Sequence, residues 1–292
     1  MSGMTGLMPL AHGPAAAGER WSELAGVLLV AALAAAYGRG VQEIWHRRGV
    51  GAVVPRWRVA AFGGGLLTLL VAQQGPIHEA SEHSLAGHMT QHMILMLLGG
   101  PLLAAGGVGL PLTVAAPRRL RHAAARLRTT GTARWLRRPL NTALVAAGLH
   151  TVVLWFWHLP LPYEWVEANT VVHGAEHVSL VGVAWLLWSM VVGPGAARLS
   201  PPVGFLLLFA TGMPAAALGA ALTLAPNVLY PGYSLTDQQL AGLIMWVPMD
   251  VVMLVVAVTL FLKWITSLDR RIPADRDLRP LDGHSETKEV PA

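Results

Sequence analysis

Residues 202–224 have the sequence PVGFLLLFATGMPAAALGAALTL and carry no charged side chain. An α-helix needs about 20 consecutive, predominantly apolar residues to cross the hydrocarbon core of a bilayer. A soluble protein would have to hide this whole run in its core, whereas lipid accommodates it directly. The run therefore predicts a transmembrane helix, and similar runs recur along the chain.

Six further apolar stretches lie near residues 23–43, 57–75, 86–114, 140–159, 171–193 and 239–266. Hydrophobic residues make up 54% of the 292 residues and charged residues only 13%, about half the charged share of soluble domains. The sequence therefore predicts an all-α, polytopic membrane bundle of seven transmembrane helices. The expected parts are an outer N-terminal segment (1–20), the transmembrane domain (21–267) and a charged cytoplasmic tail (268–292).

The third stretch, 86–114, is too long for one straight crossing and contains Gly99, Gly100 and Pro101. Proline lacks the backbone N–H that a helix interior uses, and its ring clashes with the preceding turn. We therefore expect a kink or an early helix end at this point.

Lysine and arginine lie almost entirely on one side of the predicted membrane. Of the 21 such residues, all but Arg20 fall in connections that alternating crossings assign to one side, with eight arginines between residues 118 and 138. Cytoplasmic loops carry this excess, so the N-terminus is predicted outside and the C-terminus in the cytoplasm. The net charge of +5 then reflects topology, and no nucleic-acid partner is expected. Residues 1–20 lack a basic segment followed by an apolar core, so no cleavable signal peptide is expected.

The chain has no cysteine, 12 histidines and 11 methionines. Thiolate metal sites and iron–sulfur clusters are therefore excluded, and any soft metal must use imidazole or thioether ligands. The predicted topology places most histidines near the outer surface: His78, His83, His88, His92, His158, His173 and His177. This accumulation predicts a metal or cofactor site on that side.

Two pairs of these histidines have helical spacing. His88 and His92 open the third stretch, and His173 and His177 open the fifth; residues four apart project from one face of a helix. The pairs lie at matching depth and are predicted to converge on one metal ion, with His158 at the same level as a further ligand. Neutral imidazole suits copper, zinc, iron and nickel.

Other residues are candidates for supporting roles. Glu176 and Gln91 are expected to orient the imidazoles through hydrogen bonds. Methionine thioether selects Cu(I), although methionine also fills gaps between packed helices. The auxiliary candidates for coordination are His78, His83, Met89, Met93, Met245 and Asp237.

Two polar residues fall deep within predicted membrane helices. His150 is near the middle of the fourth stretch and Asp250 well inside the seventh. A charge at such depth is costly, about 2.5–3.5 kcal/mol on insertion scales, so these side chains usually have a partner inside the bundle. We expect the two to pair, either as a proton or metal relay or as a structural hydrogen bond.

Several motifs in order resemble a known family. They are His88-Met89-Thr90-Gln91-His92-Met93, Trp157-His158-Leu159-Pro160, His173-Gly174-Ala175-Glu176-His177, Tyr230-Pro231-Gly232-Tyr233 and Asp237-Gln238-Gln239-Leu240-Ala241-Gly242. The chain is similar over about residues 60–265 to the CtaG-type cytochrome c oxidase assembly factors, bacterial seven-helix proteins of the cytoplasmic membrane. The resemblance implies a role in maturing the copper centres of a haem–copper oxidase.

The leading hypothesis is therefore an assembly factor without catalytic turnover. It would bind copper at the outer histidines, receive it from an outer-side donor and pass it to an oxidase subunit in the membrane. The chain could act alone or as a homodimer. Two alternatives remain: an intramembrane zinc-dependent hydrolase with Asp237 or Glu176 as base, and a b-type haem protein with axial histidines.

Overall fold

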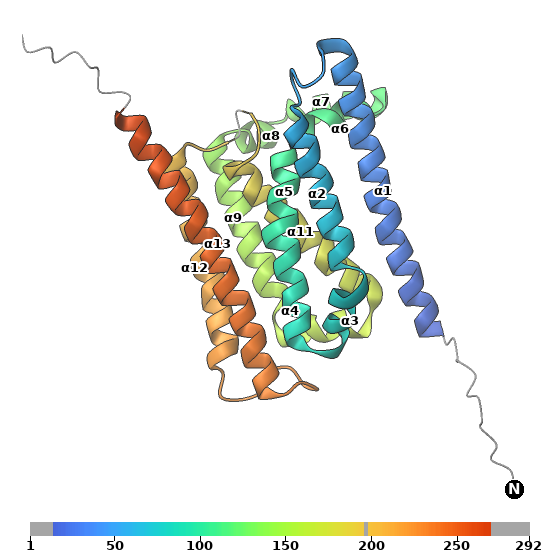
Figure 1. Cartoon of the computed structure of the whole chain (residues 1–292), viewed down its shortest axis with the longest axis vertical. Helices are drawn as coiled ribbons and strands as arrows, with labels where there is room; N and C mark the ends of the chain where they lie inside the picture. Colours follow the sequence, from blue (N-terminus) through green and yellow to red (C-terminus); the bar gives the residue numbers. More distant parts are fainter. Residues whose placement is uncertain (1–13, 196–197, 270–292) are drawn as a thin grey trace, which may run out of the picture.

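The computed structural model describes residues 14–195 and 198–269, and regular structure within these residues is helical. Figure 1 shows long helices side by side, with short helices across both ends of the bundle. The long elements are α1 (Pro14–Arg48), α2 (Arg56–Ala72), α4 (Leu85–Ile94) continuing into α5 (Gly100–Gly106), α9 (Pro139–Trp157), α11 (Thr170–Val191), α12 (Pro201–Leu224) and α13 (Leu235–Asp269).

Six helical segments are long and apolar enough to cross a membrane: Leu24–Arg48, Leu85–Gly106, Pro139–Trp157, Thr170–Val191, Pro201–Leu224 and Leu235–Leu268. The predicted polytopic helical bundle is thereby confirmed. The expected span at 57–75 also forms a helix, α2, but it has only 17 residues. It packs between α1 and α5 (Figure 1).

The third span neither ends nor breaks at Pro101. A π-helical segment, Leu95–Gly99, joins α4 to α5, and the Gly100 N–H donates to the Leu95 carbonyl oxygen. A wider turn of this kind relieves the helix where proline supplies no amide hydrogen. α5 ends instead at Gly107, whose φ of +66° lies in the left-handed region that glycine adopts readily. The rest of the predicted stretch becomes a separate helix, α6 (Gly109–Ala115).

α12 and α13 form a closely packed antiparallel hairpin (Figure 1). A Cβ atom placed on Gly242 would lie 2.6 Å from the Gly219 carbonyl oxygen and 2.5 Å from Thr223 Oγ1. Glycine therefore lets the two backbones approach more closely than any side chain would permit, as in other membrane helix pairs.

Short helices lie at both ends of the bundle. α3 (Gly75–His83) and α10 (Pro160–Ala168) lie at the end where α4 and α11 begin, whereas the arginine-rich α7 (Arg118–Arg128) and α8 (Gly131–Leu136) lie at the opposite end (Figure 1). The histidine pairs and the arginine cluster are therefore separated by the length of the bundle, as the charge pattern predicted.

The predicted terminal segments fall mostly outside the described residues. Residues 1–13 of the expected outer segment and 270–292 of the expected tail lie there. α1 begins at Pro14, so part of the expected N-terminal segment belongs to the first helix.

Candidate metal centre

The histidine pairs occupy the first turns of two helices whose starts are fixed by side-chain caps. Ser84 Oγ accepts from the Gly87 N–H at 2.9 Å at the start of α4, and Asn169 Oδ1 accepts from the Val171 and Val172 N–H groups at 2.8 and 3.2 Å at the start of α11. Such caps satisfy amides that the helix itself leaves free.

Glu176 lies between the two pairs. One oxygen of its carboxylate, Oε2, is 3.5 Å from Nε2 of both His88 and His92. Ring centroids are 4.3 Å apart within the α4 pair and 4.4 Å apart within the α11 pair. Between helices they are 5.3 Å apart for His88 and His173 and 5.4 Å for His92 and His177. The predicted convergence of imidazoles from separate spans is present in the structure.

The cluster is buried, and its polar atoms lack hydrogen-bond partners. Glu176 and His92 are fully buried. Among the described residues, Nε2 of all four histidines and both oxygens of Glu176 form no hydrogen bond. Unpaired buried polar atoms are costly, and a cation coordinated by these atoms would remove that cost. Nitrogen and carboxylate oxygen ligands are the donor set of zinc and copper sites, so the residues fit a metal ion.

His158 lies beside this cluster, with its ring centroid 5.7 Å from that of His92. The Leu154 carbonyl oxygen can only accept, so His158 Nδ1 donates to it, at 2.7 Å. The lone pair of Nε2 then faces the sulfur atom of Met89, 3.3 Å away. The Tyr230 hydroxyl donates to the His158 carbonyl oxygen at 2.6 Å and fixes its backbone. His158 and Met89 therefore form a buried pair of soft donors next to His92.

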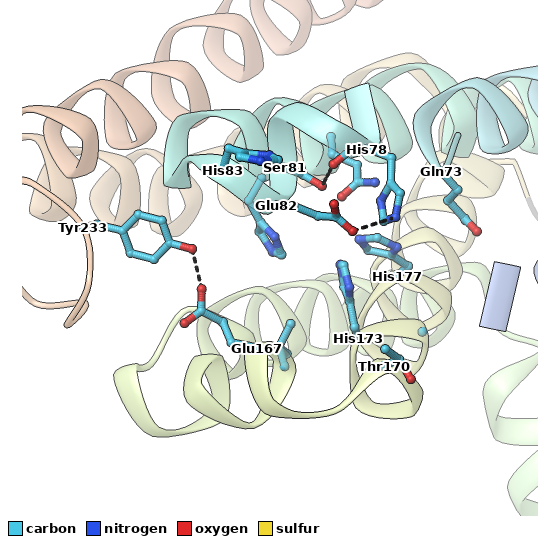
Figure 2. A pocket seen from close by; sticks show the side chains of 14 residues that line it. Gln73, His78, Ser81, Glu82, His83, Glu167, Thr170, His173, His177 and Tyr233 are labelled. Atoms are coloured by element: carbon cyan, nitrogen blue, oxygen red, sulfur yellow. Dashed lines mark hydrogen bonds and ion pairs between the residues drawn. The ribbon is translucent and has the colours of Figure 1, made fainter. Parts of the chain in front are cut away.

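A cavity of about 460 Å³ leads to the cluster between α3, α10 and α11. Figure 2 shows the rings of His173 and His177 directed from α11 into the space beneath α3. His78 and Glu82, 3.3 Å apart on α3, line the same cavity with His83. These two predicted auxiliary histidines thus lie along the approach to the cluster.

Other predicted site residues lie elsewhere or have different contacts. Met93 and Met245 are buried in the hydrophobic core. Gln91 donates from Nε2 to the Ala72 carbonyl oxygen at 2.7 Å, which ties α4 to the end of α2. The Asp237 carboxylate accepts from the Leu85 and Ala86 N–H groups at 2.8 and 3.2 Å, so α13 contributes a second cap to α4.

The expected pairing of His150 with Asp250 is wrong. Asp250 Oδ2 instead accepts from Trp246 Nε1, 2.7 Å away and one turn earlier on the same helix. His150 is buried on α9, and its Nδ1 atom has no hydrogen-bond partner within the described part of the chain. Trp246, four residues before Asp250 on the same helix, provides the hydrogen bond that the Asp250 carboxylate needs. The similar depth of His150 and Asp250 in the membrane therefore did not predict the partner.

Sequence reasoning missed the role of two tyrosines, Tyr163 and Tyr233. The Tyr163 ring packs edge-on against the His88 ring, with centroids 5.4 Å apart, and its hydroxyl donates to the Tyr233 hydroxyl at 3.2 Å. Tyr233 in turn donates to Glu167 (Figure 2). Burial raises the pKa of Tyr163, and burial together with the Glu167 contact raises the pKa of Tyr233 to about 12. Both phenols therefore stay protonated, as donors that close one side of the cluster. The Tyr230-Pro231-Gly232-Tyr233 motif in the sequence could have indicated that Tyr233 contributes to the site.

The family model described as cytochrome c oxidase caa3 assembly factor (Caa3_CtaG) matches residues 35–267. The chain belongs to this family. The match includes every helix that contributes to the histidine cluster, and it confirms the family resemblance of the sequence motifs. No curated protein and no solved structure shows a significant match to the chain. Members of this family are described as cytochrome c oxidase caa3 assembly factors.

Proposed function

We propose that this Caa3_CtaG protein binds copper at the cluster of His88, His92, His173, His177 and Glu176 and delivers it to a maturing oxidase subunit. The observation that carries the proposal is a buried carboxylate among four imidazoles whose Nε2 atoms have no hydrogen-bond partner in the part of the chain that the structure describes. The family supplies the context of oxidase assembly, and the donor set supplies the metal chemistry.

The proposal includes a topology in the bacterial cytoplasmic membrane. α2 is the seventh crossing: its 17 residues span about 25 Å at 1.5 Å per residue, and it packs alongside longer spans. The arginine-rich α7 and α8 then face the cytoplasm. The histidine cluster faces the outer side, because it lies at the other end of the bundle (Figure 1).

In this proposal the protein transfers copper to the oxidase subunit and catalyses no reaction. The cavity lined by His78, Glu82 and His83 gives an outer-side donor access to His173 and His177. Ligation that uses no thiolate holds copper less firmly than a closed cysteine site, which favours release to the oxidase. His158 and Met89 extend the donor set by one imidazole and one thioether.

The proposal is tested by metal analysis and by complementation. Detergent-purified protein is expected to bind copper, and a His88→Ala/His92→Ala variant is expected to bind clearly less of it. In cells lacking the native protein, the same variant should fail to restore oxidase activity and oxidase copper content. His122→Ala, an exposed histidine on α7, is the matched control. A double variant that bound as much copper as wild-type protein and supported full oxidase activity would refute the assignment.

The same preparation separates the alternative functions. Retained zinc, together with hydrolysis of a lipid ester or amide, would indicate the zinc-dependent hydrolase, whose metal would activate water. A Soret absorption band would indicate the b-type haem protein.

A further inference from the structure

The donor atoms of the cluster fall into two groups of three. Side-chain donor atoms of His88, His92 and Glu176 all lie within 4.8 Å of one another, and those of His173, His177 and Glu176 do the same. Each group takes two histidines from one helix, and the carboxylate belongs to both.

A single ion does not fit this arrangement as well as two ions do. Ligand atoms bound to one zinc or copper ion at about 2.0–2.1 Å can be at most about 4.2 Å apart. Donor atoms within each triad lie within 4.8 Å of one another, so a small shift closes each triad around an ion, whereas the five side chains together form no such set among the described residues. Histidines within a pair are closer than any pair across the interface. Each helix therefore presents its own two-imidazole position.

Glu176 has the properties of a bridging carboxylate. Both of its oxygens are buried and have no hydrogen-bond partner within residues 14–195 and 198–269, so one oxygen is available for each position. Bridged two-metal sites have ions about 3.5–4 Å apart, a separation that one carboxylate spans. A negative charge between two cations also offsets their mutual repulsion.

From these contacts we infer that the cluster holds two metal ions, one on His88 and His92 and one on His173 and His177, bridged by Glu176. The inference rests on the metal binding in the proposed function and specifies its stoichiometry. Each ion has three protein ligands, which leaves coordination positions open. His88, His173 and His177 line the cavity, so both open positions are accessible to an exchanging ligand.

The test is metal stoichiometry combined with electron paramagnetic resonance of the full chain in detergent, loaded with Cu(II). Wild-type protein is expected to bind two ions per chain and to show an integrated Cu(II) signal well below its copper content, because bridged ions couple magnetically. His88→Ala/His92→Ala and His173→Ala/His177→Ala should each retain one ion, with a signal that accounts for all bound copper. His122→Ala should behave as wild type.

Glu176→Gln keeps the side-chain volume and removes the charge of the bridging group. In this variant the integrated Cu(II) signal is expected to account for all the bound copper, whether the protein still binds two ions or only one. Thermal melting and gel filtration establish that each variant is folded, and a misfolded double variant is replaced by the single variants His92→Asn and His177→Asn, for which the same loss of one ion is expected.

The outcomes separate the two proposals. If wild-type protein bound one ion per chain and either double variant bound none, the two-ion inference would be overturned. The proposal of copper binding would still hold. Two ions with unchanged coupling in Glu176→Gln would overturn the bridge. No copper bound by wild-type protein would overturn both this inference and the proposed function.

Discussion

Oε2 of Glu176 on α11 lies 3.5 Å from Nε2 of His88 on α4, and the same distance from Nε2 of His92. These separations exceed the usual range of an N–H···O hydrogen bond, about 2.7–3.2 Å, although all three side chains are buried. The two helices thus bring a carboxylate and imidazoles together without hydrogen bonds between them, an arrangement that a cation would complete.

The first prediction concerns the charge of Glu176. Glu176→Gln is expected to weaken copper binding at least about tenfold, a loss that even residues supporting a metal ligand commonly cause. The metal-free variant should melt at the same or a higher temperature than metal-free wild type, because a buried carboxylate without a partner is destabilising. Isothermal titration and melting curves with and without copper give both quantities. Unchanged affinity in a folded variant would contradict the prediction.

The second prediction separates thioether ligation from packing at Met89. Met89→Leu conserves volume and should change the unfolding free energy by less than about 1.5 kcal/mol. It removes the sulfur that lies 3.3 Å from His158 Nε2, so Cu(I) affinity should fall while Zn(II) affinity remains unchanged, because thioether selects the softer ion. Competition with a Cu(I) chelator measures the Cu(I) affinity. Met245→Leu, in the core, is the control; equal losses in both variants would exclude a specific role for Met89.

The third prediction concerns the cap that Asp237 provides to α4. Asp237→Ala removes the acceptor of the Leu85 and Ala86 N–H groups, and loss of a helix cap costs about 0.5–2 kcal/mol. The melting temperature should fall, and metal affinity should fall with it because the cap holds the turn that carries His88. Asp237→Asn, which keeps one acceptor oxygen, is expected to lie between wild type and Asp237→Ala. A folded Asp237→Ala variant with wild-type stability would show that the cap is dispensable.

The fourth prediction tests the close packing of α12 and α13. Gly242→Ala places a methyl group within 2.6 Å of the Gly219 carbonyl oxygen, and such overpacking typically costs about 1–3 kcal/mol. Gly212→Ala on α12 is the control, since a Cβ there meets no atom within 4 Å and alanine favours a helix over glycine. Melting temperatures should therefore move in opposite directions, down for Gly242→Ala and up or unchanged for Gly212→Ala.

Much of the fold followed from the apolar runs, because the length of a membrane-spanning helix is set by bilayer thickness. The expected runs at 140–159, 171–193 and 202–224 correspond to α9, α11 and α12 within a few residues. The run at 57–75 was predicted as a span but gave a 17-residue helix. The short helices α3 and α10 lie between the expected spans and were not predicted, since their limited length leaves little periodic signal.

The two histidine pairs of the site were also predicted from the sequence, because helical geometry determines which residues share a face. His88 with His92 and His173 with His177 share a helix face by spacing alone. Contacts between helices could not be predicted in this way. The hydrogen bond from Trp246 to Asp250 replaced the expected partner His150, because several residues at one depth are equally plausible partners until the helices are packed.

The sequence by itself determined that the chain forms apolar helices, that histidines gather at one end and arginines at the other, and which histidines lie together on one helix. These properties depend on helical periodicity and on the cost of placing charge in lipid, and both act locally along the chain. Only the tertiary structure decided that Glu176 is shared by two histidine pairs, that Met89 faces His158, and that Asp237 caps α4. Each of these relationships depends on the rotation and offset of packed helices, which no single segment of sequence specifies.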